Sequence, residues 1–117
     1  MAQRYGPRMA VMPAGERWPS DESLRPAFED WVGAGAIISH LAGTWSPEAR
    51  AAATTFRGVQ SDLAALLQSC GSGKELMACG FAKDVALAAA RNVSACVPVF
   101  RDGAYVPWRN HGLWSPA

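Results

Sequence analysis

The feature that most constrains the fold is an apolar stripe between Ser46 and Cys70. Its apolar and small residues follow one another in steps of three and four, which places them on one face of an α-helix. They are Ala49, Ala52, Phe56, Val59, Leu63, Leu66 and Cys70. Ser46 is a suitable N-cap and Pro47 suits the first helical position, so we expect one helix that begins there and ends at Gly71-Ser72-Gly73.

Two further helices are predicted, one on each side of this stripe. The first begins between Ser20 and Arg25 and stops at Gly43, and the third runs over about 74–92. Gly33 and Gly35 weaken the first helix, each by about 1 kcal/mol relative to alanine. They indicate either that another backbone approaches closely there or that the helix bends.

A C-terminal β-hairpin is predicted around Asp102-Gly103, because this dipeptide lies between two β-prone runs. A two-residue loop there pairs Arg101 with Ala104, Phe100 with Tyr105, Val99 with Val106, Pro98 with Pro107 and Val97 with Trp108. A hairpin alone is marginally stable in water. We therefore expect its face of Val97, Val99, Val106 and Trp108 to pack on the helices.

A chain of 117 residues predicts a single domain. The expected class is mainly α, as a three-helix antiparallel bundle with an extended N-terminal arm and a C-terminal β-hairpin. The segments are an arm over 1–19, the bundle over 20–96, the hairpin packed on it over 97–108 and a mobile tail over 109–117. The long stripe of the second helix also predicts a homodimer. Its seam would consist of Phe56, Val59, Leu63 and Leu66.

Composition and cysteine content indicate the cellular compartment and exclude some classes of binding partner. The formal net charge is +1 and 18% of the residues are charged, which does not favour nucleic-acid binding. The longest apolar run, over 34–38, is far shorter than the roughly 18–20 residues of a membrane span. Three cysteines without dense spacing are typical of a reducing compartment. We expect a cytoplasmic protein that does not bind a membrane.

Two short motifs invite a chemical interpretation that their spacing does not support. Gly71-Ser72-Gly73-Lys74 lacks the glycine spacing of a phosphate-binding loop and is followed by Glu75 instead of serine or threonine, so it is interpreted as a turn between helices. Cys70, Cys79, Cys96 and His111 do not have the paired spacing of zinc modules. No metal site and no cofactor are predicted.

The remaining polar residues do not suggest a catalytic site either. Cys70 falls at a predicted helix C-terminus, which disfavours a thiolate, and His40 is typical of a helix end. Glu29 and Asp30 are adjacent on a helix and so point about 100° apart. They are interpreted as charge at a helix start, and no catalytic residue is predicted.

The five tryptophans are the unusual feature of the composition. Several lie in extended, arginine-containing ends, and aromatic residues with arginine are enriched in binding hot spots. The predicted partner-binding residues are Trp18, Arg101, Tyr105, Trp108, Arg109 and Trp114. The same composition also suits an arm that clamps onto its own domain.

The function predicted from these observations is non-enzymatic. We expect a small regulatory protein that binds another protein as an adaptor, inhibitor or anti-activator. One alternative is a small-molecule-binding helical protein or enzyme subunit, with a pocket among Phe28, Trp31, Phe56, Met77 and Phe81. Another is nucleic-acid binding through the arginine-rich and aromatic termini.

Overall fold

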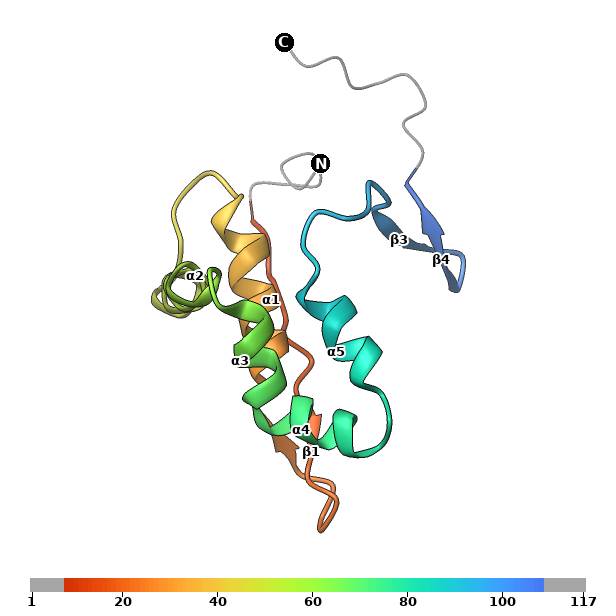
Figure 1. The fold of residues 1–117 in the computed structure, drawn as a ribbon. Coiled ribbons are helices and arrows are strands. Elements are labelled where there is room, and N and C mark those ends of the chain that lie inside the picture. The colour runs from red at the N-terminus through yellow and green to blue at the C-terminus, as the bar shows by residue number, and fades with distance from the viewer. Residues whose placement is uncertain (1–7, 109–117) are drawn as a thin grey trace.

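The computed structural model describes residues 8–108 of the chain (Figure 1). Within this range it is mainly helical, with two small antiparallel hairpins. The elements are β1 (Glu16–Arg17), β2 (Leu24–Arg25), α1 (Phe28–Ser39), α2 (Pro47–Val59), α3 (Leu63–Ser69), α4 (Gly71–Ala78), α5 (Ala82–Ala89), β3 (Pro98–Arg101) and β4 (Ala104–Pro107). The mainly α class is confirmed.

The prediction of a three-helix bundle is wrong, because the described part of the chain has five shorter helices. The expected start of α2 is confirmed: Pro47 follows the cap Ser46, whose Oγ accepts a hydrogen bond from the N–H of Ala49 at 3.2 Å. The long helix is interrupted over 60–62, between α2 and α3. The third predicted helix is divided between α4 and α5, where Gly80 adopts a φ of 89° that suits glycine.

The first helix begins later than expected, at Phe28. Arg25 precedes a proline, which disfavours the helical conformation. It is instead extended in β2, paired with Glu16 of β1. Pro26 and Ala27 then lead into the helix, and Glu29 and Asp30 occupy its first turn.

The Gly71-Ser72-Gly73 segment is the first turn of α4, which corrects the prediction that it is a turn between helices. The break between α3 and α4 lies at Cys70, which is extended with a ψ of 168°. Its Sγ accepts a hydrogen bond from the N–H of Gly73 at 3.4 Å. A Cβ on Gly73 would lie 1.7 Å from the carbonyl oxygen of Leu67, so only glycine allows this close approach of α3 and α4.

The hydrophobic core joins α1 to the helices that follow it. One buried cluster comprises Val32, Phe56, Leu63, Leu67 and Val85, and a second comprises Ile38, Ala52 and Ala53. A Cβ on Gly35 would lie 2.1 Å from the carbonyl oxygen of Ala52, whereas one on Gly33 would meet nothing. The backbones of α1 and α2 therefore approach closely at Gly35, and a residue with a Cβ would not fit there.

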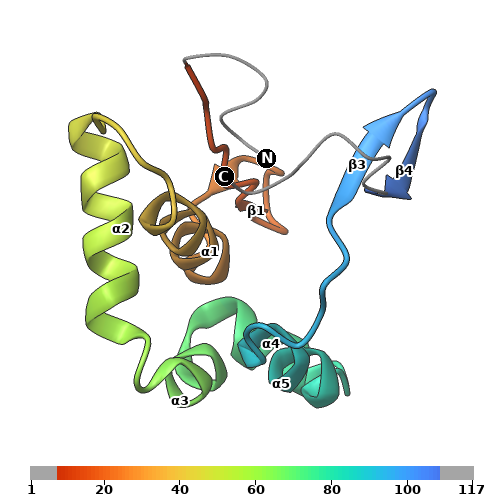
Figure 2. The same cartoon turned by 90° about the horizontal axis from the view of Figure 1, so that it is seen from above.

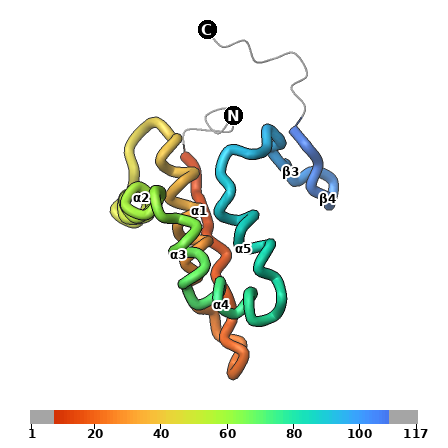
Figure 3. The backbone as a smooth tube through the Cα atoms, in the orientation of Figure 1, coloured from red at the N-terminus to blue at the C-terminus, as the bar shows by residue number. Residues whose placement is uncertain are grey.

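The β3–β4 hairpin has the register predicted from Asp102-Gly103, from Pro98 opposite Pro107 to Arg101 opposite Ala104. Figures 1 and 2 show it projecting from the helical body, and Figure 3 shows the long segment that connects it to α5. Of the face expected to dock on the helices, Val97 is 46% exposed and Val106 37%, while Val99 and Trp108 are half-buried.

No helix among residues 8–108 is long and apolar enough to cross a membrane. The division of the chain into arm, bundle, hairpin and tail stays a prediction. The tail over 109–117, with Arg109, His111 and Trp114, lies outside the described residues.

Candidate functional site

Two neighbouring hollows lie between α1, α2, α3 and the segment that follows α5. The smaller, of about 300 Å³, is lined by Glu29, Asp30, Val32, Gly33, Ala36, Phe56, Leu63, Leu67, Ala88 and Arg91. The larger, of about 460 Å³, is lined by Ala36, Ile37, Ser39, His40, Phe56, Arg57, Gln60, Arg91 and Asn92. Ala36, Phe56 and Arg91 line both hollows. We call the two together the Arg91 groove.

One end of the Arg91 groove is cationic. His40 follows α1, Arg57 lies in the last turn of α2, and Arg91 follows α5. The guanidinium of Arg91 lies over the ring of Phe56, 5.3 Å from its centroid, and its Nη1 donates a hydrogen bond to Oε1 of Gln60 at 3.2 Å. Both arginines are exposed and open to solvent, so this end can bind an anion.

The other end carries two carboxylates from the first turn of α1, Glu29 and Asp30. The Oε2 of Glu29 accepts a hydrogen bond from the Oγ of Ser72 at 2.5 Å. The Oδ2 of Asp30 accepts one from the N–H of Gly15 at 2.7 Å. The two neighbours therefore bond to different elements, as their 100° separation on a helix requires. Ser72 is 7% exposed and does not line the hollow, whereas Glu29 does.

A second set of polar contacts holds in place the first turn of α4, which carries the partner of Glu29. Ser72 Oγ lies 3.5 Å from the Sγ of Cys70, which caps the same helix. Arg25 forms an ion pair with Glu75 of α4, and its guanidinium lies 4.9 Å from the centroid of the Trp18 ring. These contacts tie β2, α1 and α4 together and fix the helix turn on which Ser72 lies.

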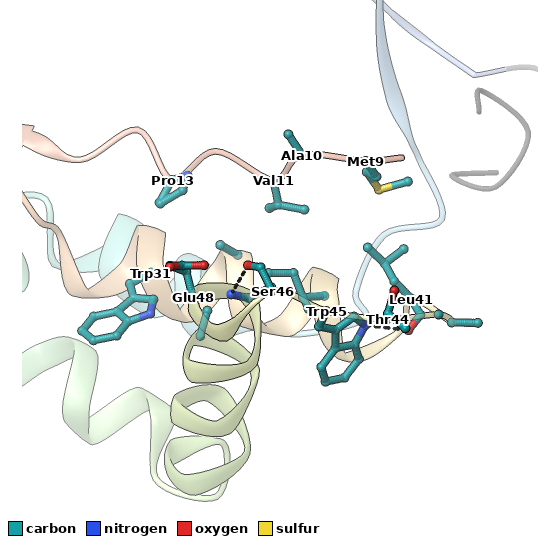
Figure 4. A pocket seen from close by; sticks show the side chains of 16 residues that line it. Met9, Ala10, Val11, Pro13, Trp31, Leu41, Thr44, Trp45, Ser46 and Glu48 are labelled. Atoms are coloured by element: carbon teal, nitrogen blue, oxygen red, sulfur yellow. Dashed lines mark hydrogen bonds between the residues drawn. The ribbon is translucent and has the colours of Figure 1, made fainter. Parts of the chain in front are cut away.

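A third hollow, of about 670 Å³, lies between the N-terminal arm and the helices α1 and α2 (Figure 4). Trp31 and Trp45 line it, and among the residues of 8–108 that line it Glu48 is the only charged one. A hydrogen bond from its own backbone N–H and a hydrogen bond from the side chain of Ser46 lower the pKa of Glu48 below its usual value. A mainly apolar hollow with one carboxylate is unsuited to an anionic ligand.

The predicted partner-binding residues do not form one surface. Trp18 follows β1, whereas Arg101 and Tyr105 lie in the β3–β4 hairpin and Trp108 follows it. Figure 1 places the two hairpins at opposite ends of the molecule. Arg109 and Trp114 lie outside the described residues.

The predicted dimer seam is only partly available to a second copy. Phe56 and Leu63 are buried in the core of the chain itself, while Val59 and Leu66 are half-buried. The homodimer stays a prediction.

The alternative ligand pocket does not form as a unit. Phe28 and Met77 pack against the same core cluster as Phe56, Trp31 lines the arm hollow, and Phe81 is exposed. Among residues 8–108, no three histidine, cysteine or acidic side chains gather so as to hold a metal ion.

Comparison with known proteins identifies the family of the chain. Residues 8–103, which include the whole Arg91 groove, match the family model of 2-phosphosulpholactate phosphatase. The match is to a class of phosphatases. The chain belongs to the 2-phosphosulpholactate phosphatase family.

A curated relative agrees with this assignment. A protein named "Probable 2-phosphosulfolactate phosphatase", from Gloeobacter violaceus, is 34% identical over 88 residues, which is 75% of this chain. The chain spans 36% of the length of that relative. No solved structure matches the chain.

These findings overturn three predictions made from the sequence. A non-enzymatic adaptor, a regulatory protein and an inhibitor are all wrong, because the family is one of phosphatases. Sequence reasoning missed the site because its residues carry no motif. His40, Arg57 and Arg91 lie on three separate segments, and only folding brings them to one groove.

Proposed function

We propose that this chain takes part in removing the phosphate group from 2-phosphosulfolactate, the compound in the name of its relative. The name describes a lactate that carries a phosphate ester, a sulfonate and a carboxylate. Such a substrate has several negative charges and requires cationic side chains in its site. The observation that carries the proposal is that Arg91 lines both the carboxylate hollow and the cationic hollow.

The residues of the Arg91 groove suggest which side chain would bind each charged group of the substrate. Arg91, which lies beside both ends, would hold the phosphate group, because a guanidinium binds phosphate through two parallel hydrogen bonds. Arg57 and His40, in the larger hollow, would hold the sulfonate and the carboxylate. The phosphorus atom is then placed next to the hollow that Glu29 lines.

Phosphate-ester hydrolysis requires a general base in addition to neutralisation of the phosphate charge. Glu29 supplies this base. Its carboxylate takes a proton from a water molecule while the water oxygen forms a bond to phosphorus. The bond between phosphorus and the ester oxygen breaks, and the departing alkoxide takes up a proton from solvent water to give the hydroxyl of sulfolactate. Glu29 returns to the solvent the proton that it removed. Water and the phosphate ester are thus converted to inorganic phosphate and an alcohol.

Ser72 positions Glu29 instead of acting as a nucleophile. Its hydroxyl is buried and bonds to the carboxylate from the side of α4, whereas substrate reaches only the groove side of Glu29. A fixed rotamer is important here, because a general base must lie within hydrogen-bond reach of the proton that it removes.

The experiment is to measure phosphate release from 2-phosphosulfolactate by the purified chain and by its Glu29→Gln and Arg91→Gln variants. Removing a general base lowers kcat by about 10²–10⁴-fold, so the Glu29 variant should lose that much. The Arg91 variant should lose kcat/KM by about 10²-fold or more, because it removes a charge-assisted pair with the phosphate.

Arg50→Gln is the matched control, because Arg50 is exposed on α2 and lines neither hollow. It should leave phosphate release unchanged. Release that is equally fast in all four proteins would contradict the proposed site, and a wild-type chain that binds the compound without releasing phosphate would contradict the proposed reaction.

A further inference from the structure

The β3–β4 hairpin exposes apolar side chains on both of its faces. Successive residues of a strand point to opposite sides, so Phe100 and its cross-strand partner Tyr105 share one face while Val106 lies on the other. Phe100 is 63% exposed and Tyr105 is 76% exposed. We call Val97, Phe100, Tyr105 and Val106 the hairpin patch.

The hairpin patch is not explained by the helical body. The hairpin projects away from the helices in both views, and its ring contact, Phe100 with Tyr105 at 5.3 Å, lies within the hairpin (Figures 1 and 2). A two-stranded hairpin with open faces is marginal in water and needs a further surface to pack on. The sequence nevertheless specifies it strongly, through Asp102-Gly103 and a self-consistent register.

The family match indicates where that surface comes from. The matched region reaches residue 103 and so includes β3 and the turn of the hairpin. This chain spans only 36% of the relative's length, so a family-length protein contains a larger body of polypeptide beside the matched region. We propose that the hairpin patch is the docking surface for that remaining polypeptide of a family-length protein.

The backbone of the hairpin favours packing of side chains over extension of the sheet. In this register, Phe100 and Tyr105 form the non-hydrogen-bonded pair, so their N–H groups point outward. The next outward position on each strand is a proline, Pro98 or Pro107, which has no N–H to donate. The outer edges therefore cannot support a long added strand, and the exposed rings carry the contact.

A second copy of this chain fits the hairpin patch less well. A symmetric contact presents the same surface on both copies. It would cover one face of each hairpin and leave the other face in water, whereas a larger polypeptide can enclose both. This proposal rests on family membership and not on the proposed reaction, because docking is measured without substrate.

The test uses the part of the Gloeobacter violaceus relative outside the 88 matched residues, purified as a separate polypeptide. It is titrated with the full chain, and the complex is measured by light scattering and calorimetry. We expect a one-to-one complex. The Phe100→Asp and Tyr105→Asp variants should each weaken it by about 10-fold or more, as expected for loss of an interface hot spot.

Met12→Asp is the matched control, because Met12 is 87% exposed and belongs to the N-terminal arm and not to the hairpin. It should leave the affinity unchanged. In a second arm, residues 8–108, which include both strands of the hairpin, replace the matched segment of the relative, and hydrogen exchange is followed at the hairpin amides. Protection of those amides relative to the isolated chain supports docking.

Three results would overturn the proposal. One is a complex that the hairpin variants do not weaken. Another is the absence of a complex together with unprotected hairpin amides in a grafted protein whose α1 and α2 amides are protected. The third is self-association of the isolated chain that Phe100→Asp abolishes, because a second copy would then occupy the patch.

Discussion

Ser72 donates a hydrogen bond to Oε2 of Glu29 at 2.5 Å, across 43 positions of sequence. The contact joins the first turn of α4 to the first turn of α1. Because the Gly71-Ser72-Gly73 segment is helical, the hydroxyl of Ser72 reaches a carboxylate of the groove. A segment interpreted as a simple connection between helices thus supports the candidate site.

Ser72→Ala removes this donor and leaves Glu29 without its partner. Leaving one member of a part-buried hydrogen bond unsatisfied costs about 1–3 kcal/mol, so the free energy of unfolding should fall by that amount. Urea denaturation followed by circular dichroism measures it. Ser69→Ala is the control, because Ser69 is exposed and bonds only to the carbonyl of Leu66. Equal stability of the two variants would argue against a structural role for the Ser72 contact.

Gly33 and Gly35 lie two residues apart in α1, in environments that differ sharply. Gly35→Ala would place its Cβ against the carbonyl of Ala52, which forces α1 and α2 apart, so we expect a loss of about 1–3 kcal/mol. Gly33→Ala meets no atom and should gain up to about 1 kcal/mol from helix propensity. Thermal unfolding of both variants gives the comparison. A stabilised Gly35→Ala protein would show that the two helices are not in close backbone contact.

The start of α2 should be sensitive to acid through Glu48. Its pKa is lowered in the folded chain by its own backbone N–H and by Ser46. A carboxyl group with a lowered pKa stabilises the fold above its unfolded pKa of about 4.5 and loses that contribution as the pH falls through the folded pKa. The melting temperature of the wild type should therefore fall more steeply from pH 6 to pH 3 than that of Glu48→Gln. Parallel curves would mean that Glu48 is not linked to folding.

Local chemistry was sufficient to predict some parts of this fold. Ser46 and Pro47 specify the start of α2 through a cap and a fixed φ, and Asp102-Gly103 specifies the hairpin register through its turn. Both signals act within a few residues. They do not depend on what the rest of the chain does.

The breaks over 60–62 and at Gly80 depend on tertiary contacts and were not predicted, whereas a helix end near Gly71-Ser72-Gly73 was expected. The stripe from Ala49 to Cys70 keeps its period, yet Phe56 and Leu63 face the same core cluster from two different helices. At the helix end that was predicted, Cys70 is extended and Gly73 packs on the carbonyl of Leu67. Periodicity alone cannot distinguish one long helix from two short helices around a common core.

The candidate site was beyond sequence reasoning for a related reason. Glu29, Arg57 and Arg91 are ordinary surface charges on separate segments, and nothing in their spacing indicates that they line neighbouring hollows. The family match recovers the enzymatic class from similarity spread over residues 8–103, without a short motif.

The most direct test of the proposed site is a nuclear magnetic resonance titration of the full chain with 2-phosphosulfolactate. We expect the shifted amides to cluster around Arg57 and Arg91. Arg57→Gln and Arg91→Gln should each weaken binding by about 10-fold or more, whereas Arg50→Gln should not. Shifts that cluster instead around Trp31 and Trp45 in the arm hollow, or binding that survives in both groove variants, would contradict it.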